Sequence, residues 1–125
     1  MKHEIEIRVY YEDTDFSGLV YHASYLRFLE RARTELLRAR GFENAALAAE
    51  HGVGFVVRRV ELEYLSPARM DDLLKVSAEL QSPKGALTVF EQIVRRGEEI
   101  LCRGRVELVT LRGGKPVRAP KWLFE

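Results

Sequence analysis

The clearest pattern in the chain is a helical one between residues 24 and 40. Apolar side chains recur there every three or four positions and form one stripe, at Tyr25, Leu29, Ala32, Leu36 and Ala39, widened by Leu26, Phe28 and Leu37. Charged residues occupy the opposite side. The pattern predicts an amphipathic helix from Ser24 to Arg40, with Ser24 as its N-cap and Gly41 just beyond its C-terminus.

Five other segments alternate between apolar and polar residues, which is typical of half-buried strands. They are Glu4 to Tyr11, Gly54 to Leu65, residues 74–80, Leu87 to Arg95 and Glu99 to Thr110. In the second of these strands, Val56 and Tyr64 are expected on the same, inward face. A shorter alanine-rich helix from Phe42 to His51 precedes this strand and ends at Gly52.

The order of these elements predicts an α+β fold. One strand, a long helix, a short helix and four further strands follow one another, and residues around Gly97 join the last two strands into a hairpin. Consecutive strands with short connections are antiparallel neighbours. We therefore expect a single domain, residues 1–125, whose five-stranded antiparallel sheet curls around the long helix. Because one helix covers only one sheet face, a second subunit is expected to bury what remains open.

Composition and charge exclude several classes of protein. The 125 residues carry a formal net charge of +1, which is no basic excess of the kind that nucleic-acid binding requires. The N-terminus lacks the apolar segment of a signal peptide, and no apolar run approaches the roughly 20 residues of a membrane span. The single cysteine, Cys102, excludes an internal disulfide and suits a reducing compartment. These features predict a cytoplasmic protein in which Cys102 is a buried strand residue.

The candidate chemistry lies in a polar loop just before the long helix. Asp13 and Asp15 in this loop, together with His22, lie close to the unpaired N–H groups and partial positive charge of a helix N-terminus. From the residues alone, turn or capping roles are the simpler interpretation of the two carboxylates. His3 and His51 stand at no metal-ligand spacing from His22, so we expect no bound metal.

The run YYEDTDFSGLVYHASYLRFLERARTELL, residues 10–37, resembles the signature of the 4-hydroxybenzoyl-CoA thioesterase family within the hotdog-fold superfamily. It is most similar to a branch of small bacterial acyl-CoA thioesterases associated with the Tol-Pal system, which residues 55–72 also resemble. The sequence departs from the family pattern at Phe16 and Ser17, where a glycine or small residue is frequent, and at Ser24, where Asn is frequent. The resemblance implies a hotdog fold, in which a five-stranded antiparallel sheet wraps around one long helix.

The resemblance also implies a function, the hydrolysis of an acyl-CoA or acyl carrier protein thioester to a free acid and a thiol. Asp15 matches the catalytic carboxylate of the family, acting as nucleophile or as base for water. The backbone N–H of His22 matches its oxyanion donor, whereas a role for the imidazole is left open. Tyr21 is expected to contact substrate, and Asp13 to bind N–H groups of the loop. No cofactor or metal is expected, because a thiolate with a pKa of about 8.5 leaves unaided.

Arg58 stands on the otherwise apolar face of its predicted strand, which indicates a carboxylate or phosphate partner such as the phosphates of coenzyme A. The resemblance and the long strand from Gly54 to Leu65 predict a homodimer, paired into a homotetramer, with the active site at the dimer interface. A non-catalytic acyl-CoA-binding or assembly module is the alternative, because fold does not fix function. A hotdog dehydratase is a weaker third, since that branch uses a different His/Asp arrangement.

Overall fold

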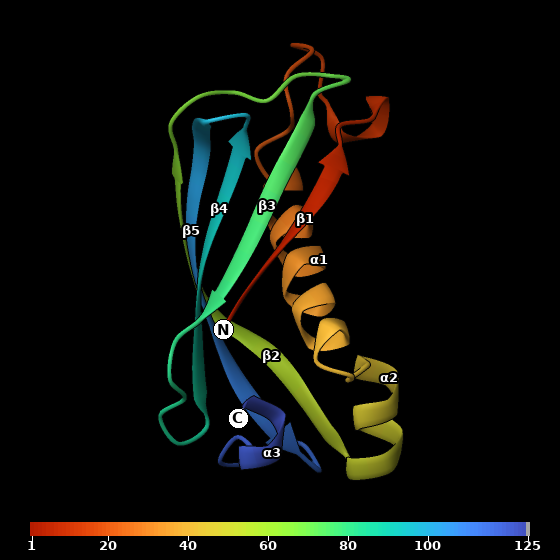
Figure 1. Cartoon of the computed structure of the whole chain (residues 1–125), viewed down its shortest axis with the longest axis vertical. Helices are drawn as coiled ribbons and strands as arrows, with labels where there is room; N and C mark the ends of the chain where they lie inside the picture. Colours follow the sequence, from red (N-terminus) through yellow and green to blue (C-terminus); the bar gives the residue numbers. More distant parts are fainter. Residues whose placement is uncertain (125) are drawn as a thin grey trace.

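The computed structural model describes residues 1–124, and its main feature is a curled antiparallel sheet packed around a long helix (Figure 1). The strands are β1 (Lys2–Arg8), β2 (Val53–Tyr64), β3 (Leu73–Leu80), β4 (Leu87–Arg96), β5 (Glu99–Arg112) and the short β6 (Lys115–Pro116). They pair in the order β1-β3-β4-β5-β2, and β6 pairs with one end of β5. The predicted antiparallel sheet around one helix is confirmed, with β6 as a short addition.

The order of the strands differs from the prediction in one respect. β2 and β3 are consecutive in the sequence, yet β2 pairs with β5 whereas β3 pairs with β1 and β4. The reason is the connection over residues 65–72, which runs across one end of the sheet instead of forming a tight turn (Figure 1). Buried Ala68 and a 2.8 Å hydrogen bond from the Val9 N–H to the Asp72 carbonyl hold this connection down. β2 is therefore an edge strand of the described sheet.

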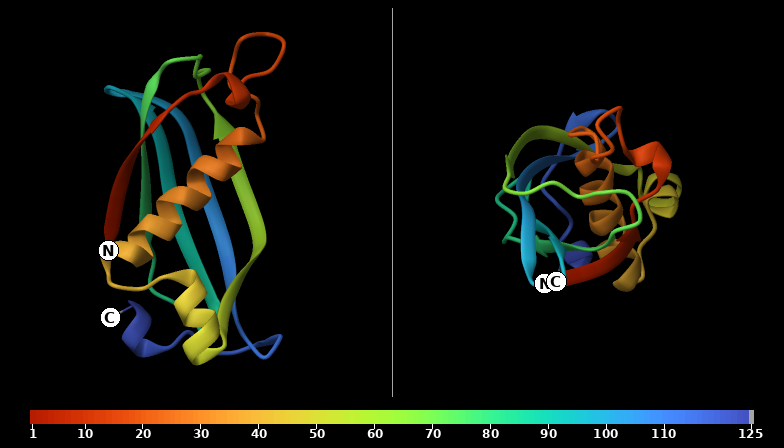
Figure 2. Two further views of the ribbon diagram at one scale, coloured as in Figure 1. Left: turned by 90° about the vertical axis from the view of Figure 1, so that its right-hand side faces the viewer. Right: turned by 90° about the horizontal axis from the view of Figure 1, so that it is seen from above.

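The helix α1 (Ser24–Ala39) crosses the inner face of the sheet (Figure 2). The sheet buries most of its apolar stripe, at Tyr25, Phe28, Leu29, Ala32 and Leu36, whereas Leu37 is buried in a small separate cluster. Leu26 and Ala39, which were expected in this stripe, are exposed because they lie on sides of the helix that the sheet does not cover. The predicted N-cap is also wrong. Ala23 holds that position, and the Ser24 hydroxyl instead donates a hydrogen bond to the Asp13 carbonyl.

The N-terminal strand is shorter than predicted. β1 ends at Arg8, and after Val9 and Tyr10 the chain enters a single 3₁₀ turn, η1 (Tyr11–Asp13). Tyr11 was expected to be the last residue of this strand but lies in the turn, where it is 80% exposed. The turn directs the chain away from the sheet and into the loop that contains Asp15.

Short helical elements close the opposite end of the molecule. The predicted helix from Phe42 to His51 is present as α2 (Asn44–Ala46) and a π-helical turn, η2 (Leu47–His51), and it ends at Gly52 as expected. A C-terminal turn, α3 (Lys121–Phe124), buries Leu123 in a small cluster with residues 37 and 47. In the described part of the chain, no helix is long and apolar enough to cross a membrane.

Strand β2 contains an irregularity that changes which of its side chains face inwards. Its pairing with β5 shifts at Arg58, which forms a β-bulge. Phe55 packs against the core before the bulge, and Val60 does so after it. The predicted inward position of Val56 is therefore wrong, and this residue is 46% exposed. Arg58 is the extra residue of the bulge. It is therefore exposed and does not interrupt the apolar face of the strand.

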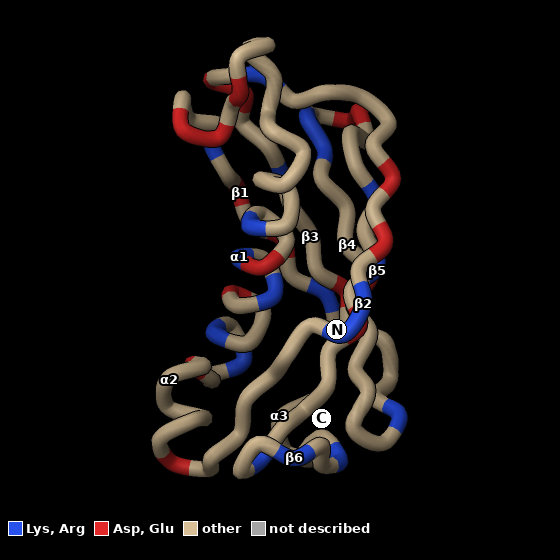
Figure 3. The backbone as a smooth tube through the Cα atoms, turned by 180° about the vertical axis from the view of Figure 1, so that it is seen from behind, with Lys and Arg blue, Asp and Glu red and all other residues tan. Residues whose placement is uncertain are grey.

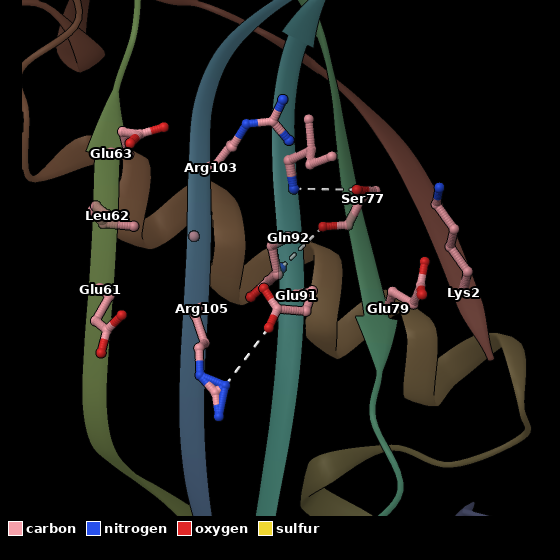
Figure 4. A pocket seen from close by; sticks show the side chains of 12 residues that line it. Lys2, Glu61, Leu62, Glu63, Ser77, Glu79, Glu91, Gln92, Arg103 and Arg105 are labelled. Carbon is pink, nitrogen blue, oxygen red and sulfur yellow. Dashed lines mark hydrogen bonds and ion pairs between the residues drawn. The ribbon is translucent and has the colours of Figure 1, made fainter.

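The outer face of the sheet carries charged side chains of both signs. Figure 3 marks where Lys, Arg, Asp and Glu lie along the backbone. One row crosses all five long strands, in the register Glu61, Arg105, Glu91, Glu79 and Lys2 (Figure 4). Arg105 lies 3.6 Å from Glu91 in this row. A charged face is stable in water, so it does not by itself require cover by a second subunit. The open edge of β2 is the stronger structural reason to expect one.

The contact between α1 and the sheet is closest at Leu29. This side chain lies over Gly104 of β5, where an added Cβ atom would be 2.8 Å from Leu29 Cδ1. Beside it, the buried amide of Gln92 donates hydrogen bonds to the carbonyls of Leu29 (3.0 Å) and Ser77 (3.2 Å). Apolar packing and a satisfied polar group therefore fix the same turn of the helix to three strands.

We predict that Leu29→Ala lowers the free energy of unfolding by about 2–5 kcal/mol, because it removes a fully buried side chain and leaves a cavity over Gly104. Leu26→Ala is the matched control on the same helix, and it should change stability by only about 0.5 kcal/mol because Leu26 is exposed. Urea unfolding followed by circular dichroism measures both variants. Equal losses would contradict the burial pattern of α1.

Candidate active site

Two of the residues predicted to carry chemistry, Asp15 and His22, meet where the loop before α1 lies beside the end of β2. A cavity of about 320 Å³ opens between them. Its lining comes from three segments, namely residues 15–20 of the loop, His22 and Tyr25 at the start of the helix, and residues 64–67 after the end of β2. These segments are far apart in sequence, so the shape of the cavity depends on the contacts that join them.

A tight turn presents Asp15 to this cavity. The Asp15 N–H donates to the Leu19 carbonyl and the Gly18 N–H to the Asp15 carbonyl, both at 3.0 Å, and Gly18 has a φ of 80° that favours glycine. The Asp15 Oδ1 atom accepts hydrogen bonds from the hydroxyl and from the N–H of Ser17, the latter at 2.8 Å. These bonds, with a smaller contribution from His22, hold the pKa of Asp15 below its ordinary value. The exposed carboxylate is therefore ionised at neutral pH.

Asp13 has the structural role that the sequence predicted. It is buried, and its carboxylate accepts a 2.8 Å hydrogen bond from the Tyr10 N–H. Its carbonyl accepts hydrogen bonds from the Tyr21 N–H at 2.9 Å and from the Ser24 hydroxyl at 3.2 Å. Asp13 thus ties the loop to the start of α1 while its own carboxylate is engaged.

His22 lines the cavity just ahead of the first turn of α1. Among the described residues, the N–H groups of His22 and Ala23 have no hydrogen-bond acceptor, as expected just ahead of a helix. The Tyr64 hydroxyl donates a 2.7 Å hydrogen bond to the His22 carbonyl and so fixes this peptide to the end of β2. A free N–H at the positive end of a helix stabilises negative charge on a nearby oxygen.

Tyr21 and Arg58 do not line this cavity in the single chain. The Tyr21 ring packs against the His22 ring with 4.4 Å between centroids, so it lies next to the site. Arg58 is exposed at the bulge, and it forms no hydrogen bond or ion pair with any residue that the structure describes. It stands six positions before Tyr64 in β2, about 20 Å along an extended strand. The structure therefore brings Asp15 and His22 together and leaves Arg58 apart.

Two residues that shape the site were not predicted from the sequence. Ser17 was noted only as a departure from the family pattern, although an Asp followed two residues later by Ser and then Gly is typical of a turn closed by side-chain hydrogen bonds. Tyr64 was assigned only to the inward face of its strand. No sequence signal indicated its contact with His22, because the two residues are 42 positions apart.

The opposite wall of the cavity is anchored by Arg96. Its Nη1 atom donates hydrogen bonds to the Asp72 carboxylate at 2.6 Å and to the Pro67 carbonyl at 3.3 Å. The Val20 N–H in turn donates to the Ala68 carbonyl at 2.9 Å. This chain of contacts connects the loop of Asp15, through residues 67–72, to the β4–β5 hairpin.

The site has no cluster of metal ligands. Across residues 1–124, no group of three or more His, Cys, Asp or Glu side chains is placed to hold a metal ion. Cys102 is buried on β5, as predicted, and burial raises the pKa of its thiol to about 11. Its thiol is therefore protonated at neutral pH and is not an activated nucleophile.

Comparison with known proteins places the chain in a family. The chain belongs to the thioesterase-like superfamily, whose family model matches residues 9–125. It is therefore an enzyme of the thioesterase class, and the predicted family and hotdog fold are confirmed.

Individual relatives agree with this assignment. The chain is 53% identical over 103 residues to the acyl-CoA thioester hydrolase YbgC of Escherichia coli O6:H1, covering 82% of this chain and 76% of that protein. It is 45% identical over 117 residues to the acyl-CoA thioesterase YbgC of Haemophilus influenzae, covering 92% and 86%. The crystal structure of a probable thioesterase from Bartonella henselae superposes with a TM-score of 0.91 at 42% identity, covering 96% of this chain and 100% of that one.

We predict that Ser17→Ala raises the pKa of Asp15 towards its ordinary value, because the hydrogen bond from the Ser17 hydroxyl to the carboxylate contributes most to lowering it. Carbon-13 NMR titration of the side-chain carboxyl measures this pKa. Ser82→Ala, in a distant exposed loop, is the control and should leave it unchanged. An unaltered Asp15 pKa in Ser17→Ala would contradict the role assigned to this hydrogen bond.

Proposed function

We propose that the chain hydrolyses acyl-CoA thioesters in the cavity that contains Asp15. The observation that supports this most directly is that Asp15, an ionised carboxylate, lines the same cavity as His22, whose N–H has no acceptor among the described residues. A thioester carbonyl bound between them meets one group that acts on its carbon and another that stabilises its oxygen. The similarity to acyl-CoA thioester hydrolases supports the same substrate class.

The reaction adds water across the bond between the carbonyl carbon and sulfur. Asp15 either attacks the carbonyl carbon itself or removes a proton from the attacking water, and both routes require the ionised form that Ser17 favours. The carbonyl oxygen gains negative charge, which the His22 N–H stabilises. A preformed donor of this kind contributes about 3–4 kcal/mol in other enzymes. The thiolate, with a pKa of about 8.5, leaves without a general acid and takes up a proton from water.

The remaining site residues are assigned to substrate binding. Tyr21, beside His22, contacts the pantetheine arm at the mouth of the cavity. Arg58 has an exposed guanidinium without a protein partner among the described residues, which suits the phosphates of coenzyme A. An acyl carrier protein presents the same pantetheine arm and is an alternative donor of the acyl group.

The working unit in this proposal is a homodimer in which two copies of β2 pair across a two-fold axis. β2 is the edge of the described sheet, and Val56 and Val57 in it are 46% and 51% exposed. Pairing would satisfy its backbone groups and cover these side chains. Two dimers then pair into a homotetramer in the cytoplasm, a reducing compartment that suits the free thiol of Cys102.

We predict that Asp15→Asn keeps the fold and lowers kcat for acyl-CoA hydrolysis by about 10²–10⁴-fold, because the amide fills the same space but is neither nucleophile nor base. Release of free thiol, followed spectrophotometrically, measures the rate, and thermal unfolding checks the fold. Near-normal turnover in Asp15→Asn, with loss in Asp13→Asn, would assign the chemistry to the other carboxylate.

We also predict that the active enzyme sediments as a dimer or larger and that its site is shared between chains. Mixing Asp15→Asn with Arg58→Ala should then restore activity, because one site of each hybrid dimer receives a normal Asp15 from one chain and a normal Arg58 from the other. Sedimentation velocity at assay concentration and the thiol-release assay test this. An active monomer, or no gain on mixing, would contradict the shared site.

A further inference from the structure

A second cavity, of about 380 Å³, lies between α1 and the beginning of β2. Its walls are mainly aromatic and aliphatic, with Phe55, Phe90, Leu108 and Phe124 among them. Arg33 and Glu30, one turn apart on α1, supply charged groups to the lining. We call this the Arg33 cavity. An apolar pocket with a few polar groups is the usual form of a small-molecule site.

Arg33 is the distinctive group of this cavity. Its Nη1 atom donates a 2.9 Å hydrogen bond to Oε1 of Gln92, whose amide nitrogen is held by two carbonyls. Within the part of the chain that the structure describes, Arg33 forms no ion pair with a carboxylate. Burial lowers the pKa of Arg33 from its ordinary value, and the negative charge of Glu30 acts in the opposite direction. The guanidinium stays protonated at neutral pH, with donors to spare for a ligand.

The two cavities lie at opposite ends of the same edge strand. Tyr64, the last residue of β2, lines the Asp15 cavity, whereas Phe55 and Val57 near its beginning line the Arg33 cavity. Two strands that pair across a two-fold axis run antiparallel, so the end of each strand lies beside the beginning of the other. A dimer formed through β2 therefore places the Asp15 cavity of one subunit next to the Arg33 cavity of its partner.

We propose that the Arg33 cavity receives the acyl group of the thioester bound at Asp15 of the other subunit, and that Arg33 selects acyl groups whose far end carries an oxygen that accepts a hydrogen bond. This rests on the proposed function and its β2 dimer. A methyl-ended chain fits the apolar walls but leaves the donors of the half-buried guanidinium that do not bond to Gln92 without a partner. A hydroxyl or carboxylate end accepts its hydrogen bond in a site from which water is largely displaced.

Glu30 distinguishes the two kinds of oxygen. It is exposed at the margin of the same cavity. Its carboxylate accepts a hydrogen bond from a hydroxyl group but repels a second carboxylate. Repulsion by Glu30 opposes the attraction of a carboxylate end to Arg33, so the presence of Glu30 shifts the preference towards a hydroxyl end. Glu30→Gln should therefore shift the preference towards the carboxylate end.

The test compares hexanoyl-CoA, 6-hydroxyhexanoyl-CoA and adipoyl-CoA, which share a six-carbon acyl chain and differ at its end. We expect wild-type kcat/KM to be about tenfold or more higher for the hydroxyl-ended than for the methyl-ended substrate, the size of a hydrogen bond to a charged group. Arg33→Met should abolish this ratio and Arg33→Lys should retain part of it. Arg31→Met, an exposed arginine on the same helix, should retain all of it. In Glu30→Gln, adipoyl-CoA should gain relative to 6-hydroxyhexanoyl-CoA.

Hybrid dimers show which subunit supplies Arg33. In a mixture of Asp15→Asn and Arg33→Met, each hybrid has one normal Asp15, and it belongs to the Arg33→Met chain. If the partner's cavity holds the acyl group, this site has a normal Arg33 opposite it. With Asp15→Asn in excess, so that few Arg33→Met homodimers remain, the measured ratio should return towards the wild-type value. A mixture that keeps the ratio of Arg33→Met would overturn the assignment across the interface.

The outcomes separate this inference from the function on which it rests. Hydrolysis of all three substrates at similar kcat/KM by the wild type would overturn the selection by Arg33 and leave the thioesterase function intact. An equal loss for all three in Arg33→Met would show a purely structural role and overturn it as well. A wild-type enzyme that hydrolyses no acyl-CoA would overturn the proposed function, and this inference with it.

Discussion

The packing of α1 against the inner face of the sheet is the interaction on which the rest of the structure depends. Its apolar stripe supplies much of the core, and Leu29 over Gly104 sets how closely the helix approaches β5. Gln92 fixes the rotation of the same turn by bonding to the Leu29 carbonyl. Because the helix is rigid, this contact also places the His22 peptide before its first turn and Arg33 one turn beyond Leu29. Both cavities are thus positioned by one helix.

The two faces of the sheet and its β2 edge have different chemical properties. Its inner face is apolar, its outer face carries cross-strand charges, and its β2 edge has open backbone groups. The bulge at Arg58 is the point where this edge changes its alternation, so that Phe55 before it and Val60 after it both face the core. One strand can therefore line a cavity at each end while keeping its middle exposed.

Local periodicity was sufficient to predict the elements, and long-range contacts account for what it missed. The spacing of Leu29 and Leu36 identified α1, and the family pattern around Asp15 identified the loop that reaches the cavity. Neither signal indicates the path that residues 65–72 take. The sequence therefore did not predict that β2 and β3 are not neighbours in the sheet. The pattern of apolar and polar residues does not reveal the bulge at Arg58. Because of this bulge, Val56 lies on the face of the strand opposite to the one expected. The Tyr64 contact to His22 depends on tertiary packing and has no local signature.

The route of residues 65–72 has a kinetic consequence. The β3–β4–β5 meander joins strands that are close in sequence, so it closes short loops and loses little chain entropy. β1 reaches β3 only from the far end of the chain, as in the pairing of Ile5 with Val76. The Asp15 turn is closed by its own short-range hydrogen bonds, whereas the cavity beside it also needs residues 64–67, which are joined to the loop through the bond from Val20 to Ala68. The cavity is therefore complete only when the crossing segment is in place. Activity at this cavity therefore requires the long-range contacts of the crossing segment as well as the local turn, so an activity assay reports whether those contacts have formed.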